Sequence, residues 1–239
     1  MNRQSNTYTI IYSAVLVLVV GIVLSVVYQA LRPMQKENIA NDTKRQILAS
    51  ARITPEGGAS IADLYAEHIT SSYIVNSNGE KIDSSVDPFD VNVAIEVKKP
   101  ADERLLPVFE CTTDNGLKYI IPVYGAGLWG PIWGYVAFDN NGDTIYGAYF
   151  AHQGETPGLG AEIEKPAFSS QFDGKDIFSP NGEFMSVDVV KVGKEPQDKA
   201  WVHAISGGTI TSQGVQTMLY DSLLPYSAFL LSLKNNNNE

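Results

Sequence analysis

The segment Ser206–Ser212 (SGGTITS) places glycines and hydroxyl side chains directly before a long apolar stretch. Glycine lets a backbone approach a ligand closely, and the stretch 214–233 predicts a helix whose N-terminus offers free N–H groups to a phosphate. The hydroxyls of Ser206, Thr211 and Ser212 can donate to phosphate oxygens. The pattern indicates a site for the phosphate of a nucleotide-like cofactor. The alternative is an ordinary turn in which Thr211 or Ser212 caps the helix.

A second glycine-rich segment, residues 152–160 (HQGETPGLG), places polar side chains beside a rigid turn. Pro157 and the glycines around it impose a tight backbone that can lie against a flat ring system. Glu155 and Thr156 can hydrogen-bond the polar edge of such a ring or the sugar chain attached to it. The alternative is the surface loop of a hairpin. The candidate binding residues of this segment are Glu155, Thr156, Gly158 and Leu159.

A third segment, residues 125–130 (GAGLWG), holds two large apolar side chains between glycines. Leu128 and Trp129 can pack against a flat aromatic cofactor. A tryptophan buried in the core is an equally open interpretation.

Two of these segments resemble the flavin-binding motifs of one protein family. Residues 203–209 (HAISGGT) are similar to Asp-x-x-Ser/Thr-Gly-Ala-Thr, whose last threonine carries FMN, and residues 155–160 resemble its Glu-Thr-Pro-Gly-Leu-Gly loop. With its apolar N-terminal segment, the whole chain resembles the C subunit of the sodium-translocating NADH:quinone oxidoreductase. Two positions depart from the motif, because His203 stands where the family has Asp and Gly208 where it has Ala.

The resemblance implies an electron-relay subunit that carries FMN covalently, through a phosphoester to Thr209. Gly207 and Gly208 would leave room for the phosphate, and Leu128 and Trp129 would form a wall of the flavin site. The implied partners are the other subunits of a membrane redox complex and a flavin transferase. NADH oxidation belongs to another subunit, because the chain has no Gly-x-Gly-x-x-Gly fingerprint. No residue of this chain is expected to be catalytic by itself.

Three other functional classes remain open. The homologous flavoprotein subunit of a ferredoxin-oxidising ion-pumping complex shares the motif. A membrane-anchored hydrolase using Ser206 is disfavoured, because Gly-x-Ser-x-Gly requires a glycine at the position of Ala204. A cofactor-free membrane-tethered adaptor would result if His203 and Gly208 prevented flavin attachment.

Composition excludes several classes of partner and cofactor. The 17 Lys and Arg against 27 Asp and Glu give a net charge of -10, and no basic stripe occurs, so nucleic acid is not an expected partner. The single cysteine, Cys111, rules out an internal disulfide and favours a buried thiol. His68, His152 and His203 are too scattered to predict a metal site.

The N-terminal region is uncharged over residues 4–31 and rich in Ile, Val, Leu and Ala. A helix of about 20 apolar residues spans the hydrocarbon core, so a transmembrane anchor in contact with lipid is predicted over residues 9–31. A cleaved signal peptide is disfavoured by the length of the apolar run and the lack of an Ala-x-Ala site. Residues 32–52 predict a juxtamembrane helix.

Two lines of argument predict opposite orientations of the anchor in the membrane. The positive-inside rule, read literally from Arg32 and Lys36, puts the large domain in the cytoplasm. The resemblance implies a bacterial inner membrane with residues 1–8 as a short cytoplasmic N-terminus and the soluble domain on the periplasmic side.

The remaining sequence predicts an α+β fold with a mainly antiparallel sheet, because strand patterns dominate without regular alternation with helices. Asn140-Asn141-Gly142 predicts a hairpin turn, residues 61–69 a short helix, and Pro225 a break in the terminal helix. The predicted strands are 91–97, 107–112, 118–123, 132–139, 144–152 and 183–192. The predicted divisions are a membrane-distal α/β part over 53–120, an FMN-binding domain over 121–234 and a disordered tail over 235–239.

Overall fold

The structure is a computed structural model that describes residues 6–55 and 57–236. Its first helix, α1 (Asn6–Ser50), contains an 18-residue window with a mean hydropathy of 2.9 and no buried residue, so it is long and apolar enough to cross a membrane. The boundary expected between residues 31 and 32 is not a break, because α1 continues through Pro33. Of the N-terminus predicted over residues 1–8, residues 1–5 lie outside the described residues and residues 6–8 belong to α1.

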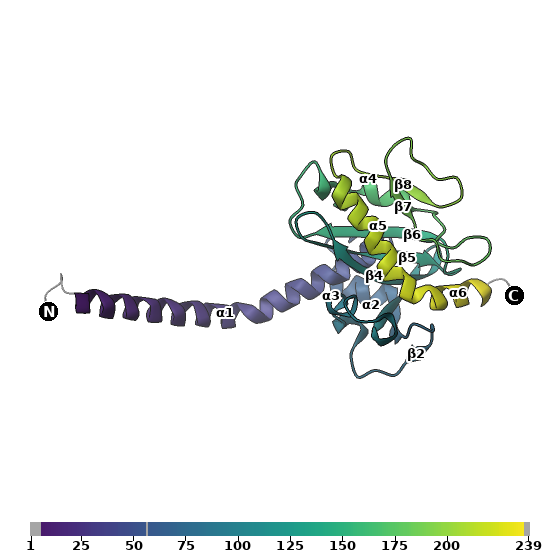
Figure 1. Ribbon diagram of the computed structural model, residues 1–239. Coiled ribbons are helices and arrows are strands. Elements are labelled where there is room, and N and C mark those ends of the chain that lie inside the picture. The colour runs from purple at the N-terminus through teal and green to yellow at the C-terminus, as the bar shows by residue number, and fades with distance from the viewer. Residues whose placement is uncertain (1–5, 56, 237–239) are drawn as a thin grey trace. The chain divides into compact units, whose positions relative to one another are not determined.

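The chain divides into two compact units, one that ends at Thr43 and one that begins at Lys44. The second unit is built on a six-stranded antiparallel sheet with the order β2-β1-β3-β4-β5-β6. Strands β4, β5 and β6 of this sheet are labelled in Figure 1. Its strands are β1 (Ile69–Val75), β2 (Lys81–Ile82), β3 (Leu106–Thr113), β4 (Gly116–Ala126), β5 (Pro131–Asp139) and β6 (Ile145–His152). The mainly antiparallel α+β class is confirmed, as are the strands predicted at 107–112, 118–123, 132–139 and 144–152. The division expected at residue 120 instead falls inside β4, so one sheet runs through both predicted parts.

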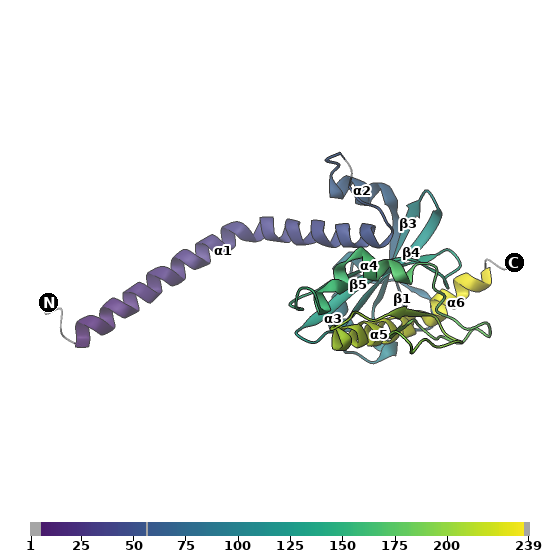
Figure 2. The same cartoon turned by 90° about the horizontal axis from the view of Figure 1, so that it is seen from above.

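Alternating side chains give this sheet two buried faces. Val108 and Ile121 belong to one apolar cluster, whereas their chain neighbours Phe109 and Ile120 belong to the other. The first cluster is covered by α5 (Thr209–Leu223), which packs on β4. The second cluster includes Ile47 from the end of α1 and side chains of α2 (Ile61–His68), which lies on the side of the sheet opposite α5 (Figure 2).

The C-terminal helix is broken as Pro225 predicts. α5 ends at Leu223, a short 3-10 turn covers Leu224–Tyr226, and α6 runs over Ser227–Asn236. The start of the predicted tail, residues 235 and 236, therefore belongs to α6, and the rest of it lies outside the described residues.

Two strand predictions are wrong. Residues 91–97 follow a 3-10 turn (Pro88–Asp90) and contain α3 (Val93–Glu96), where the buried Glu96 carboxylate accepts hydrogen bonds from Leu105 N and Lys99 Nζ. Of 183–192, only β7 (Asp188–Val190) is a strand. It pairs in parallel with β8 (Trp201–His203), and the left-handed backbone of Ser186, with φ 58°, interrupts the extended conformation before it. Short helical turns complete the unit: a 3-10 turn (Ala101–Glu103), a 3-10 turn (Gly160–Glu164), α4 (Pro166–Ser169) and a 3-10 turn (Ser170–Phe172).

Candidate functional site at the start of α5

The three segments singled out in the sequence meet where α5 begins. Gly208 is the N-cap of α5 and Thr209 is its first residue, with a half-buried side chain. The first amides of an α-helix have no intrahelical acceptor, so this end of α5 offers N–H groups and a positive dipole end. Thr209 therefore presents a hydroxyl at a position suited to a phosphate.

Glu155 links the three segments. Its side chain is 4% exposed, Oε1 accepts a hydrogen bond from Trp129 N at 2.8 Å, and Oε2 accepts one from Thr211 Oγ1 at 2.5 Å. The carboxylate therefore binds the 125–130 segment and the first turn of α5 at once. Each oxygen thus accepts from a donor of the protein itself, and the contact expected between this side chain and a ligand stays a prediction.

Two glycines are required by the position of this carboxylate. A Cβ on Gly127 would stand 2.5 Å from Glu155 Oε1, and a Cβ on Gly160 would collide with both Glu155 Oε2 and Thr211 Oγ1. Such distances are too short for any Cβ, so a side chain at either position would displace Glu155. The glycines that suggested a ligand-approaching backbone thus also make room for a protein carboxylate.

The hydroxyls of Thr211 and Ser212 are directed inward. Both side chains are buried, and Ser212 Oγ accepts a hydrogen bond from Ile205 N at 3.0 Å. Thr211 donates its hydroxyl to Glu155 Oε2, and these contacts hold the loops that adjoin the start of α5. Neither residue caps the helix, because α5 begins earlier, at Thr209. Ser206 is exposed in the turn before α5.

Gly207 and Gly208 shape the turn before Thr209. Gly207 has φ 77°, and a Cβ there would stand 2.6 Å from Leu159 Cδ2. A Cβ on Gly208 would stand 3.0 Å from Ile205 Cγ2 and 3.3 Å from Gly160 N. The turn therefore packs directly against the 152–160 loop.

Large apolar side chains remain exposed around this turn. Trp129 is 68% exposed, so its side chain is not part of the core. The exposed fractions of the other three are 47% for Leu128, 43% for Leu159 and 54% for Ile210. Ile210 was not predicted as a site residue, although it follows Thr209 directly. Thr156 and Gly158 are exposed on the same loop as Leu159, and Gly158 N donates to Glu162 Oε1 at 3.1 Å.

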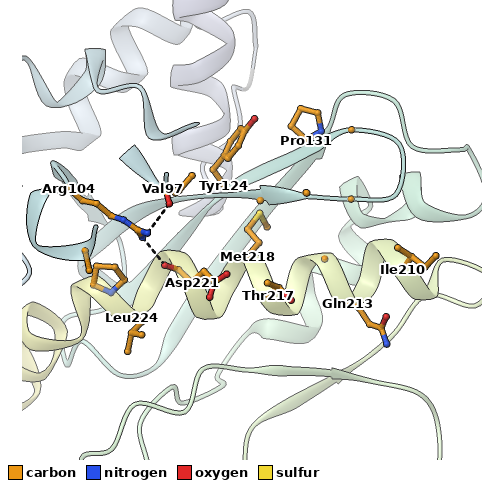
Figure 3. A pocket seen from close by; sticks show the side chains of 17 residues that line it. Val97, Arg104, Tyr124, Pro131, Ile210, Gln213, Thr217, Met218, Asp221 and Leu224 are labelled. Atoms are coloured by element: carbon orange, nitrogen blue, oxygen red, sulfur yellow. Dashed lines mark hydrogen bonds between the residues drawn. The ribbon is translucent and has the colours of Figure 1, made fainter. Parts of the chain in front are cut away.

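A groove of about 1020 Å³ follows α5 away from Thr209, between this helix, β4 and residues 97–104 (Figure 3). Its walls include Ile210, Tyr124 and Met218. Arg104 closes the far side by donating to Val97 O at 2.8 Å and to Asp221 O at 3.2 Å. No local sequence pattern predicted this groove, because Arg104 and Asp221 lie far apart in the chain.

His203, which departs from the flavin motif, lies at the end of β8. Its ring contacts the Trp201 ring edge-on with centroids 4.9 Å apart, and Nδ1 lies 4.0 Å from Glu195 Oε1 without a hydrogen-bond partner among the described residues. The N–H of Gly193, which donates to Glu195, lowers the pKa of that exposed carboxyl. No group of three or more His, Cys, Asp or Glu side chains that could hold a metal occurs in residues 6–55 and 57–236.

Known proteins resemble this chain in sequence and in fold. Residues 127–223 match the FMN-binding domain family. The C subunit of the Na(+)-translocating NADH-quinone reductase of Vibrio anguillarum is 32% identical, over 90% of this chain and 89% of the relative. The same subunit of Pseudomonas aeruginosa is 30% identical over 98% of both chains.

Two solved structures share the fold. The crystal structure of the Na(+)-translocating NADH-quinone reductase C subunit from Parabacteroides distasonis has a TM-score of 0.77 and 48% identity, and covers 84% of this chain and 96% of that chain. The crystal structure of NqrC from Shewanella oneidensis has a TM-score of 0.68 and 28% identity, with 82% of this chain and 98% of that chain covered.

Proposed function

Because the chain belongs to the family of C subunits of the Na(+)-translocating NADH-quinone reductase, we propose that it relays electrons through an FMN held covalently on Thr209. The linkage is a phosphoester between Thr209 Oγ and the phosphate of FMN, formed with the net loss of one water. The observation that carries this proposal is the meeting of three predicted segments at the first residue of α5.

The phosphate end of the site is made by the turn before α5. Ser206 contributes an exposed hydroxyl, and Gly207 and Gly208 keep side chains away from the turn. The amides at the start of α5 can donate to the phosphate oxygens. Thr211 and Ser212 support the turn from inside through their bonds to Glu155 and Ile205.

The ring end of the site is supplied by the exposed apolar side chains. Leu128, Trp129, Leu159 and Ile210 would otherwise leave apolar surface in water, and a flat isoalloxazine ring can cover part of it. The bound flavin would supply the one- and two-electron chemistry. The protein residues bind and orient the ring and exclude water from one side of it.

The long apolar helix α1 and the family support a proposal for the arrangement of the chain in the membrane. We propose that α1 anchors the protein in a bacterial inner membrane, with the soluble unit on the periplasmic side. Electrons would enter from and leave to other subunits of the complex, since this chain lacks a dinucleotide fingerprint. A flavin transferase would attach the FMN.

The proposal is tested by producing the full chain together with its flavin transferase. Intact mass and flavin fluorescence in a denaturing gel are measured for the wild type, Thr209→Ala and Thr209→Ser. We expect the wild type and T209S to gain the mass of one FMN less water, and T209A to lose both signals. An unmodified wild type, with the transferase shown to be active on another substrate, would contradict the proposal and favour the cofactor-free adaptor.

A further inference from the structure

Glu155 is a buried carboxylate whose hydrogen-bond donors are both neutral. The backbone N–H of Trp129 and the hydroxyl of Thr211 bind its two oxygens. Across residues 6–55 and 57–236, no ion pair includes Glu155. The negative charge is therefore not neutralised locally by a side chain.

Such an arrangement is unfavourable for a purely structural link. Removing a carboxylate from water costs free energy that two neutral donors offset only in part. A neutral side chain of the same shape could join the same segments at a lower desolvation cost. The start of α5 lowers the cost for a carboxylate, because Thr211 lies in the first turn, where the helix dipole favours negative charge.

The charge lies between the two parts of the proposed flavin site. Its Trp129 partner belongs to the apolar wall, and its Thr211 partner lies two residues after the attachment residue Thr209. Gly127 and Gly160 pack so closely on the carboxylate that no Cβ fits between them and it. Water is therefore largely excluded from this charge, and its electrostatic field reaches further than that of a surface group.

We propose that Glu155 is a positioning residue that lowers the reduction potential of the flavin, an inference that rests on the proposed attachment of FMN to Thr209. Glu155 fixes the backbone of Trp129 and the first turn of α5 relative to each other. Its negative charge opposes the arrival of electrons on the ring. Two-electron reduction of the flavin is therefore less favourable than it would be beside a neutral side chain.

The test compares two variants of the full-length flavinylated chain that each weaken the link but differ in charge. Glu155→Gln removes the charge and keeps the shape, whereas Thr211→Val keeps the charge and removes one of its donors. The midpoint potential of the flavin is measured by spectroelectrochemical titration in detergent. Gly154→Ala is the matched control in the same loop, because a Cβ there meets nothing within 4 Å.

We expect E155Q to raise the ratio of reduced to oxidised flavin at the wild-type midpoint about tenfold, which is about 30 mV for a two-electron couple. T211V should lower this ratio, and G154A should leave it unchanged. If the variants acted only by loosening the loops, E155Q and T211V would shift the midpoint potential of the flavin in the same direction. That result would overturn the proposal.

Failure of this inference differs from failure of the proposed function. A wild-type chain without flavin would contradict attachment, whereas equal midpoints in flavinylated wild type and E155Q would contradict only the role of Glu155. If E155Q accepts no flavin, T211V decides alone. A lower ratio of reduced to oxidised flavin supports the inference, and an unchanged or higher ratio overturns it.

Discussion

Asp143 and Glu155 are two buried carboxylates in loops that border β6, and their surroundings differ. Asp143 Oδ1 accepts hydrogen bonds from Ile177 N at 3.0 Å and Phe178 N at 2.9 Å, and Oδ2 pairs with Lys234 Nζ at 2.6 Å. Glu155 has two neutral donors and no ion pair among the described residues. Both carboxylates hold together segments that are distant in sequence, but only Asp143 has its charge balanced.

This difference in charge balance suggests that Asp143 stabilises the fold, whereas Glu155 also acts at the proposed flavin site. Asp143 ties the turn between β5 and β6 to residues 177–178 and to α6, and Lys234 confines its field. Glu155 links the segments around Thr209. Because its charge is not paired, its electrostatic field acts on a ligand bound there. A balanced carboxylate therefore serves the fold, whereas an unbalanced one can also influence a cofactor.

The largest effect is expected from Asp143→Ala. This change removes the carboxylate that pairs with Lys234, leaves the buried Phe178 N–H without its acceptor and leaves Ile177 N only its 3.2 Å bond to Asp143 O, so the free energy of unfolding should fall by about 3–5 kcal/mol. Urea unfolding of the full chain in detergent measures this change through tryptophan fluorescence, because all three tryptophans lie in the unit that begins at Lys44. The flavin potential of the folded variant should not change, and a shift as large as that of E155Q would remove the contrast between the two carboxylates.

A smaller effect on stability, with a larger one on the site, is expected from Gly160→Ala. The new Cβ would collide with Glu155 Oε2 and Thr211 Oγ1, and overpacking of this kind costs about 1–3 kcal/mol. Flavin attachment, measured by intact mass, should fall because the first turn of α5 is displaced. Gly154→Ala is again the control, and equal attachment in the two variants would show that the link through Glu155 is not needed.

The smallest effect is expected from Lys234→Met, which removes the cation and keeps the aliphatic chain. Asp143 retains its two backbone donors, so the free energy of unfolding should fall by only about 1–2 kcal/mol. The same urea titration measures the change. A loss as large as that of D143A would mean that the ion pair, rather than the backbone hydrogen bonds, carries the stabilisation.

Local patterns were sufficient to predict much of the sheet. The hairpin between β5 and β6 was predicted from Asn140-Asn141-Gly142, and Gly142 has the positive φ of 66° that such a turn requires. The same alternation misled at 91–97, because Val93 and Val97 are also one helical turn apart and tertiary contacts of Glu96 favour the helix. A seven-residue window could not distinguish these two periods.

The site was predictable as three segments but not as one arrangement. The residue types in each segment suggest a ligand, and Trp129 and Leu159 are exposed to solvent. The inward contacts of Glu155 depend on donors 26 and 56 residues away. Nothing in the local sequence distinguishes a carboxylate that faces a ligand from one that binds its own protein.

The hydrogen bonds of Glu155 also determine when the proposed attachment site at Thr209 can form during synthesis of the chain. A polypeptide is made from its N-terminus, so α1 and the sheet are synthesised before α5. Thr211, which completes the link to Glu155, comes after all six strands of the sheet. The arrangement around Thr209 therefore cannot form before the strands of the sheet have been made, and a modifying enzyme that requires this arrangement could not act on a shorter nascent chain.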